Sequence, residues 1–161
     1  FFKEHYYLDL PHPPCAEYFV GTVEGELVCH VAVCPLFTAK AYRATRLVVM
    51  PEWQGAGVGT TFLNAVMQYH LEGNGRCGHK YPTFFHTSHP QLCGYLRNAK
   101  KWVQNSAKLH GDNKARSKKS MAATSKGFPS DKGKQRRHSG GYGGHFRAIQ
   151  GFKYIGNGEQ I

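Results

Sequence analysis

The sequence has no apolar run long enough to cross a membrane, and it has few acidic residues. No stretch of its 161 residues approaches the ~18 consecutive apolar residues of a transmembrane helix, and no signal peptide is visible. We therefore expect no membrane partner. The five cysteines are odd in number and lack the spacing of a disulfide framework, which favours reduced thiols and a cytoplasmic protein.

Several catalytic and metal-binding motifs are also missing. The sequence contains no Gly-x-Ser-x-Gly, so it has no anchor for a hydrolase triad of that kind. It contains no His-x-Glu followed by Cys-x-x-Cys, which excludes a zinc deaminase. The pairs Cys77/His79 and His86/His89 have no second pair at the spacing of a zinc site. Although the chain has ten histidines, we expect no bound metal.

A glycine-rich segment lies between a predicted strand and a predicted helix. The strand is followed by Pro51, then by Gly55, Gly57 and Gly59, and residues 58–72 repeat apolar side chains at helical spacing. Glycine lets the backbone bend tightly and approach a ligand closely. The free amides and the dipole at the start of a helix attract an anion. The order of strand, glycine loop and helix therefore predicts a site for a phosphate-bearing ligand.

The glycine loop lacks the marks of two common nucleotide sites. No Lys follows Gly59, which excludes a Walker loop. Thr60 stands where the dinucleotide fingerprint needs a third glycine, and Glu72 is too close to be its ribose-binding acid.

Read as Gln-x-x-Gly-x-Gly, and preceded by Leu-x-Val-x-Pro, this segment resembles motif A of the GNAT acyltransferases. In that family the loop binds the pyrophosphate of acetyl-CoA, and the strand before it offers backbone groups to the pantetheine arm. The resemblance implies that acetyl-CoA contacts Leu47, Val48, Val49, Gln54, Gly55, Ala56, Gly57, Val58, Gly59 and Thr60.

A second resemblance to this family lies in residues 83–102. GNAT domains commonly carry an Asn after the fifth strand and a Tyr seven residues later; Ser88 and Tyr95 take these places. The resemblance implies that Ser88 contacts the cofactor and that Tyr95 is the general acid for the departing thiolate. A phenol with a pKa near ~10 can protonate a thiolate of pKa ~8.5 when the two are aligned. The alternative is that Tyr95 packs as an ordinary aromatic of an amphipathic helix.

The general base is harder to identify. Many GNAT enzymes use a Glu around the fourth strand, but residues 43–50 contain no carboxylate. We name His30 as the candidate base, although a histidine on such a strand is more often structural. Glu26, His86 and Glu52 are further candidates, and an ordered water is another.

The predicted elements follow the order of the GNAT fold from its second strand onward. This resemblance implies an α+β fold, a mixed and mostly antiparallel central sheet flanked by helices, in one domain over residues 1–161. Residues 1–10 are expected to end a helix, and Glu24-Gly25 to form a hairpin turn. We predict strands over 18–23, 27–34, 43–50 and 83–87, helices over 58–72 and from Pro90 (capped by Ser88) to about 101, and a closing strand or hairpin within 142–156.

Positive charge is concentrated in one segment. Of 21 Lys and Arg residues, 12 lie between Lys100 and Arg137, against only Asp112 and Asp131. The segment has no hydrophobic period, so we expect a flexible basic insertion at about 103–141. It can serve as an electrostatic arm for RNA or another acidic partner, or it can be a solvated insertion.

The sequence as a whole predicts an N-acetyltransferase that moves an acetyl group from acetyl-CoA to an amine acceptor, with a tilt towards a macromolecular acceptor. Two alternatives stay open. One is a non-catalytic regulatory module that binds acetyl-CoA, which would explain the missing base and Ser88. The other is a nucleic-acid-binding protein that uses the basic 100–137 segment.

Overall fold

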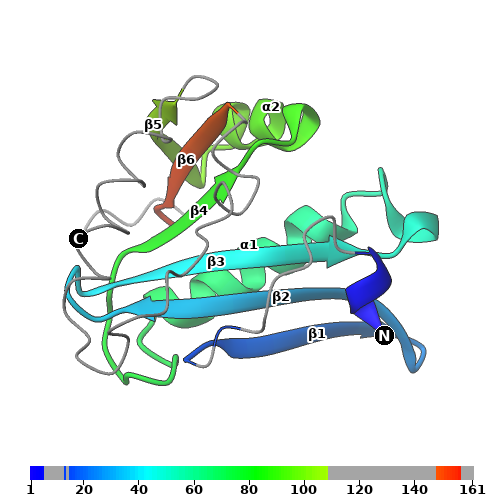
Figure 1. Ribbon diagram of the computed structural model, residues 1–161, viewed down its shortest axis with the longest axis horizontal. Helices are drawn as coiled ribbons and strands as arrows, with labels where there is room; N and C mark the ends of the chain where they lie inside the picture. Colours follow the sequence, from blue (N-terminus) through cyan, green and yellow to red (C-terminus); the bar gives the residue numbers. More distant parts are fainter. Residues whose placement is uncertain (6–12, 14, 109–147, 157–161) are drawn as a thin grey trace, which may run out of the picture.

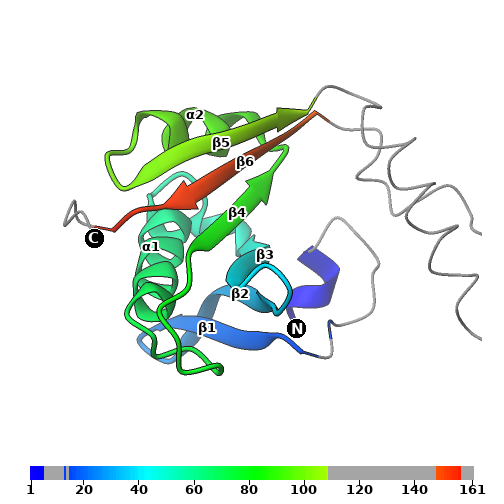
Figure 2. The same ribbon diagram turned by 90° about the vertical axis from the view of Figure 1, so that its left-hand side faces the viewer.

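The computed structural model describes residues 1–5, 13, 15–108 and 148–156. This part of the chain forms one six-stranded sheet in the order β1-β2-β3-β4-β6-β5. Helices α1 and α2 lie on one side of the sheet and the short helix η1 on the other (Figures 1 and 2). The elements are η1 (Phe2–His5), β1 (Glu17–Val23), β2 (Glu26–Leu36), β3 (Ala41–Val49), η2 (Pro51–Trp53), α1 (Val58–Leu71), β4 (Thr83–Thr87), α2 (Pro90–Asn98), β5 (Trp102–Lys108) and β6 (Ile149–Tyr154). The predicted α+β class with a mixed sheet is confirmed.

The first three strands form an antiparallel meander. Glu24 and Gly25 join β1 to β2 with φ angles of 50° and 86°. Two consecutive positive φ angles make the kind of two-residue turn whose twist matches that of the strands it joins. The hairpin turn predicted at these residues is confirmed.

Strands β3 and β4 are parallel neighbours because α1 carries the chain from the end of one to the start of the other. A parallel pair needs such a crossover, since a short turn can only join antiparallel strands. Only three residue pairs connect β3 and β4, from Tyr42↔Thr83 to Ala44↔Phe85. Beyond these pairs the two strands separate.

The core lies between the sheet and the two helices. Helix α1 buries Leu63, Val66, Met67 and His70, which recur at the helical spacing that the sequence indicated. The three apolar ones pack in one cluster with residues of β2, β3, β4, α2 and β6, among them Val31, Val33, Tyr42, Phe85, Leu96, Phe152 and Tyr154.

His70 links the end of α1 to β1. Its ring is fully buried, and Nδ1 lies 2.8 Å from the carbonyl oxygen of Val66 while Nε2 lies 3.1 Å from Glu17 Oε2. A carbonyl oxygen only accepts, so Nδ1–H donates to Val66, and Nε2 meets the Glu17 carboxylate as an ion pair when the ring is protonated. The backbone amide of Arg76 donates to the same carboxylate oxygen at 2.8 Å. This pair fastens the helix to the edge of the sheet.

The start and end of α2 differ from the sequence prediction. Its N-cap is His89 rather than Ser88: the His89 Nδ1 accepts from the backbone amide of Leu92 at 3.4 Å. The helix ends at Asn98 and not near residue 101, because Trp102 begins a strand.

Strand β5 was not predicted, since residues from 103 onward were expected to begin the flexible insertion. Most of its side chains are polar or exposed, and only Trp102 is buried. Its backbone is held by antiparallel pairing with β6, which follows much later in the chain. The insertion from residue 109 onward lies outside the described residues. The predicted closing element corresponds to β6, with its expected start at residue 142 also outside them.

Replacing Glu17 by Ala should lower the free energy of unfolding by about 2 kcal/mol, because it leaves the buried His70 ring without its carboxylate partner. Urea denaturation followed by circular dichroism measures this change. The matched control is Glu26→Ala, an exposed carboxylate at the start of β2, which should change stability by less than about 0.5 kcal/mol. Equal effects of the two substitutions would contradict the assigned role of the ion pair.

Candidate active site

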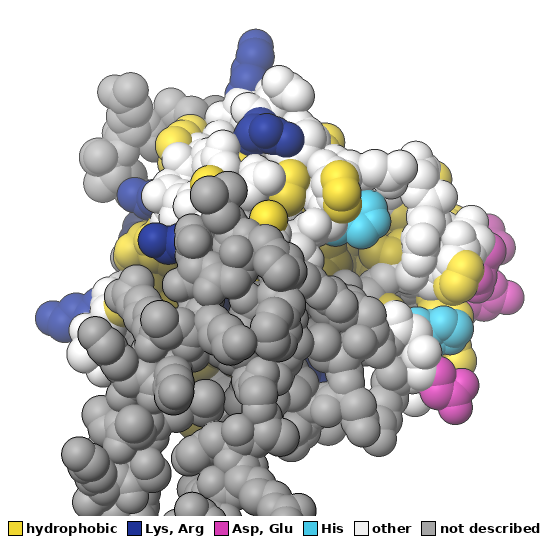
Figure 3. Space-filling model, turned by 45° about the horizontal axis from the view of Figure 1, so that its top comes forward, with side chains coloured by type: hydrophobic (Ala, Val, Ile, Leu, Met, Phe, Trp, Pro, Cys, Tyr) yellow, Lys and Arg dark blue, Asp and Glu magenta, His cyan; other side chains and the backbone are white. Residues whose placement is uncertain are grey.

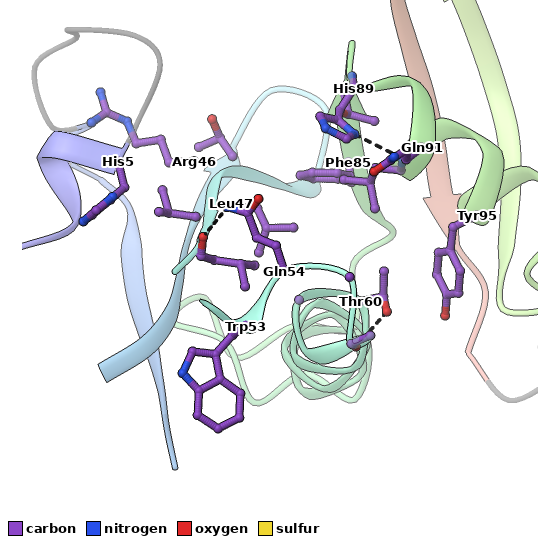
Figure 4. A pocket seen from close by; sticks show the side chains of 18 of the residues that line it. His5, Arg46, Leu47, Trp53, Gln54, Thr60, Phe85, His89, Gln91 and Tyr95 are labelled. Atoms are coloured by element: carbon purple, nitrogen blue, oxygen red, sulfur yellow. Dashed lines mark hydrogen bonds between the residues drawn. The ribbon is translucent and has the colours of Figure 1, made fainter. Parts of the chain in front are cut away.

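A cavity of about 660 Å³ opens where β3 and β4 separate. The cause is a bulge in β3: Ala32 pairs with Thr45 and His30 with Val48, so two residues of β3 oppose one of β2. Arg46, in the bulge, has a φ of 56°. A bulge bends its strand, and Figure 1 shows β3 and β4 diverging from their paired region. Elements η1, β3, β4, α2 and the loop before α1 contribute to the wall (Figure 4).

The loop between η2 and α1 is separated from the bent end of β3 only by the short helix η2. Gly55 and Gly57 have φ angles of 84° and 77°, which only glycine adopts without strain. At Gly59 the constraint is space, because a Cβ there would come within 2.5 Å of Val49 Cγ2. The Gln54 amide donates to the carbonyl oxygen of Val49 at 2.9 Å and ties the loop to the strand. The three glycines therefore fix a tight loop against the end of β3.

This loop has the properties of an anion site. Gly57 is the N-cap of α1, and the first amide that bonds back to its carbonyl is that of Thr61, at 3.0 Å. The amides of the preceding helical residues thus have no acceptor within the helix, and the helix dipole favours negative charge there. Thr60 Oγ donates to the Gly57 oxygen at 2.9 Å, which holds the first turn. A Cβ at Gly57 would meet only Thr60 Oγ, at 3.9 Å, so this side of the loop faces open space. The loop thus fits a pyrophosphate.

Tyr95 reaches the cavity from α2 and is held by a chain of hydrogen bonds. The Trp102 indole donates to Asn64 Oδ1 at 2.7 Å, and Asn64 Nδ2 donates to the Tyr95 hydroxyl oxygen at 3.3 Å. An indole N–H can only donate, which fixes the amide with its nitrogen towards Tyr95. The Tyr95 oxygen is therefore an acceptor in this chain, and its own proton is left for another acceptor. The ring is 41% exposed.

The structure brings together most of the residues predicted for the site. Those that line the cavity are Leu47, Val48, Val49, Gln54, Gly55, Gly57, Gly59, Thr60 and Tyr95. Ala56 in the glycine loop and Val58 at the start of α1 are not part of the wall. Ser88 lies between β4 and α2 and is not part of the wall either.

The predicted base His30 is not part of the described cavity wall. It sits on β2, and its ring is stacked with those of Phe2 and Tyr18 at centroid distances of 5.4 and 5.8 Å. The other candidates Glu26 and Glu52 are exposed and do not line the cavity. Of the four side chains considered from the sequence, only His86 contributes to the wall.

Several wall residues carry no signal in the sequence, among them Trp53, His89 and Gln91. They come from η2, from the N-cap of α2 and from α2 itself, and only the folded chain places them beside the glycine loop. The described wall contains no Asp or Glu. Figure 3 shows that, where this face is described, Asp and Glu side chains gather at one edge, apart from the Lys and Arg side chains. Tyr95 lies at the opposite end of the cavity from His5 and Arg46 (Figure 4).

Two further findings concern metals and membranes. Within residues 1–5, 13, 15–108 and 148–156 no group of three or more His, Cys, Asp or Glu side chains could hold a metal ion. In the same part of the chain no helix combines the length and the apolar composition needed to cross a membrane.

The profile of the acetyltransferase (GNAT) family matches residues 1–91. No curated protein sequence matches the chain. Similar solved structures include a variant of spermidine N-acetyltransferase from Vibrio cholerae (TM-score 0.55, 11% identity, covering 89% of this chain and 68% of that one). Another is the ribosomal-protein-S18-alanine N-acetyltransferase of Escherichia coli (TM-score 0.55, 11% identity, covering 99% of this chain and 88% of that one). A third is a protein described as a streptothricin acetyltransferase from Bacillus anthracis, in complex with acetyl coenzyme A (TM-score 0.54, 11% identity, covering 93% of this chain and 70% of that one).

The fold and the cavity thus define an acyltransferase that uses acetyl-CoA. The chain belongs to the GNAT acetyltransferase family. At such low identities the likeness to the solved structures shows the fold, and the acceptor of this chain does not follow from it. The comparisons give no support to RNA or DNA as a partner.

Replacing Gly57 by Val should weaken acetyl-CoA binding at least tenfold in calorimetric titration, because the new side chain projects into the cavity where the phosphates would approach. The matched control is Gly25→Val in the β1–β2 turn. Its φ of 86° imposes comparable backbone strain of about 1–2 kcal/mol on any other residue, and a Cβ at this position would have no neighbour within 4 Å. Binding should be normal in this control. Equal affinity of the Gly57 variant and the native protein would place the phosphate site elsewhere.

Proposed function

We propose that this enzyme transfers the acetyl group of acetyl-CoA to a primary amine carried by a peptide or another macromolecule. The observation that carries the proposal is the meeting of three features in one cavity: the bent end of β3, the glycine loop at the start of α1, and the hydroxyl of Tyr95. When bound, acetyl-CoA supplies the acyl group as a thioester.

The cofactor-binding residues act through their backbone. Leu47 to Val49 follow the last residue of β3 that is paired with β4, so backbone groups on that side can bind the pantetheine arm as an added strand would. The amides of Gly55 to Thr60 would hold the pyrophosphate. Both contacts orient the thioester, and alignment of the two reactants is the main source of rate enhancement.

Tyr95 would protonate the thiolate as it departs. The hydrogen-bond chain from Trp102 through Asn64 supports this role, because it occupies a lone pair of the phenol and leaves its proton available. A positioned proton donor typically contributes about 10²–10⁴-fold to a rate.

The acceptor proposal comes from the charge of the wall. Polyamines carry several positive charges and need carboxylates as partners, but the described wall has none, and Arg46 lies on it. An amine on a peptide brings fewer charges into the cavity. This favours a macromolecular acceptor over spermidine.

Thiol release from acetyl-CoA should be measured with three acceptors: a peptide with an N-terminal alanine, a peptide containing lysine, and spermidine. We expect turnover with a peptide and at least tenfold lower kcat/KM with spermidine. Acetyl-CoA binding without thiol release in any of these reactions would instead favour the regulatory module.

Tyr95→Phe should lower kcat about 100-fold and leave the affinity for acetyl-CoA unchanged, because only the proton donor is removed. The matched control is Tyr69→Phe: Tyr69 is also 41% exposed but lies on α1 outside the cavity wall. This control should retain native kcat. A Tyr95 variant with native kcat would refute the general-acid role.

Asn64→Asp should lower kcat roughly tenfold or more with little effect on the KM for acetyl-CoA. The aspartate can still accept from the Trp102 indole, but it cannot donate to Tyr95 and would instead accept the phenol proton. The same change at Asn98, whose side chain donates to the Gly94 carbonyl of its own helix, serves as the control. Identical kinetics of the two variants would show that the orientation of Tyr95 does not depend on Asn64.

A further inference from the structure

We propose that His86 is the general base that removes a proton from the acceptor amine, an inference that rests on the transfer reaction proposed above. The argument combines the face of the sheet on which His86 lies, the space that Gly151 leaves for its ring, and the positions of the other histidines of the wall.

His86 lies on the face of the sheet that is left for the acceptor. In β4, Thr83 and Phe85 are buried towards α1, so Phe84 and His86 point to the opposite face. The α1 side is filled by the core and by the glycine loop that would hold the cofactor. An amine must therefore reach the thioester from the other face, where His86 lines the cavity next to the last residue pair of β3 and β4.

Gly151 of β6 makes room for the His86 ring. It is the direct cross-strand neighbour of His86. A Cβ at this position would come within 2.7 Å of His86 Cδ2, and would also meet the side chains of Ser106 and Asn105. The ring thus lies over a strand position that only glycine can occupy, partly covered by protein while one part stays in contact with solvent.

The surroundings keep this histidine neutral, as a base must be before it acts. Partial burial lowers the pKa of His86 below its ordinary value of 6.5, and the Arg43 guanidinium of β3 lowers it further. The other charged residues of the two neighbouring strands are Lys153 of β6, paired with Phe84, and Arg46 of β3, which lines the same cavity. Ser106 and Asn105 of β5 do not titrate.

The other histidines of the wall are less suited to this role. His89 Nδ1 accepts the hydrogen bond that caps α2, so protonating it there would break the cap. His5 lies on η1 at the end of the cavity opposite Tyr95 (Figure 4). Among the histidines of the described wall, His86 is therefore the one that lies on a central strand of the sheet.

His86 and Tyr95 together account for both protons that the acceptor nitrogen loses. The acceptor arrives as an ammonium ion, and His86 takes one proton from its nitrogen, directly or through one water. The freed lone pair then forms the C–N bond, while the C–S bond breaks with its electron pair going to sulfur. Tyr95 protonates the sulfur, and the second proton lost by the nitrogen restores the phenol. His86 releases its proton to solvent.

The test is the pH profile of thiol release from acetyl-CoA, with the peptide acceptors named above, for four proteins: native, His86→Gln, Arg43→Gln and His79→Gln. His86→Gln should lower kcat about 100-fold without changing the affinity for acetyl-CoA. Arg43→Gln removes the positive charge that disfavours protonation of His86. The pKa of His86 therefore rises, and the acid limb of the kcat/KM profile moves to higher pH. The exposed His79 lies outside the wall, and its variant should behave like the native protein.

Histidine NMR titration of the same four proteins gives a reading that needs no acceptor. The His86 resonance, assigned by its loss in His86→Gln, should titrate below pH 6.5 and shift upward in Arg43→Gln. Native kcat in His86→Gln, or an acid limb that does not follow the NMR shift, would overturn the base assignment alone. Absence of thiol release in the native protein would overturn the proposed function and this inference with it.

Discussion

Strands β3 and β4 share only three residue pairs, and the whole site depends on their separation beyond Ala44 and Phe85. The bulge at Arg46, where two residues of β3 oppose one of β2, turns the strand away from its neighbour. Because the glycine loop follows the same strand, this bend also aims the first turn of α1 at the opening. One local distortion thus produces both the cavity and its anion-binding wall.

The alternation of side chains along β4 divides the proposed chemistry between two faces. Phe85 and His86 are adjacent in the chain, yet one closes the core under α1 and the other faces the acceptor side. Tyr95 reaches the cavity from α2, so proton donor and proton acceptor come from different elements. Such a division lets the cofactor and the amine approach from separate directions without competing for the same space.

Local patterns predicted the parts of the site that neighbouring residues determine. The glycine loop, the buried face of α1 and strand β4 depend on short spacing and were found as expected. The Arg46 bulge depends on pairing with β2, and β5 depends on β6, so neither leaves a local signal. Similarly, the Asn64–Trp102 bond joins residues 38 positions apart. The stacking of the His30 ring with Phe2 and Tyr18 likewise becomes apparent only in the folded chain.

The bond from Trp102 to Asn64 connects Tyr95 to the outermost strand of the sheet. Edge strands with mostly exposed side chains open locally more readily than central ones. When β5 detaches from β6, the indole leaves Asn64, the amide is free to rotate, and Tyr95 loses its fixed donor geometry. If Tyr95 is the proton donor proposed here, local opening of β5 would lower the fraction of molecules competent for proton transfer, which would make that fraction a property of the sheet edge rather than of the cavity.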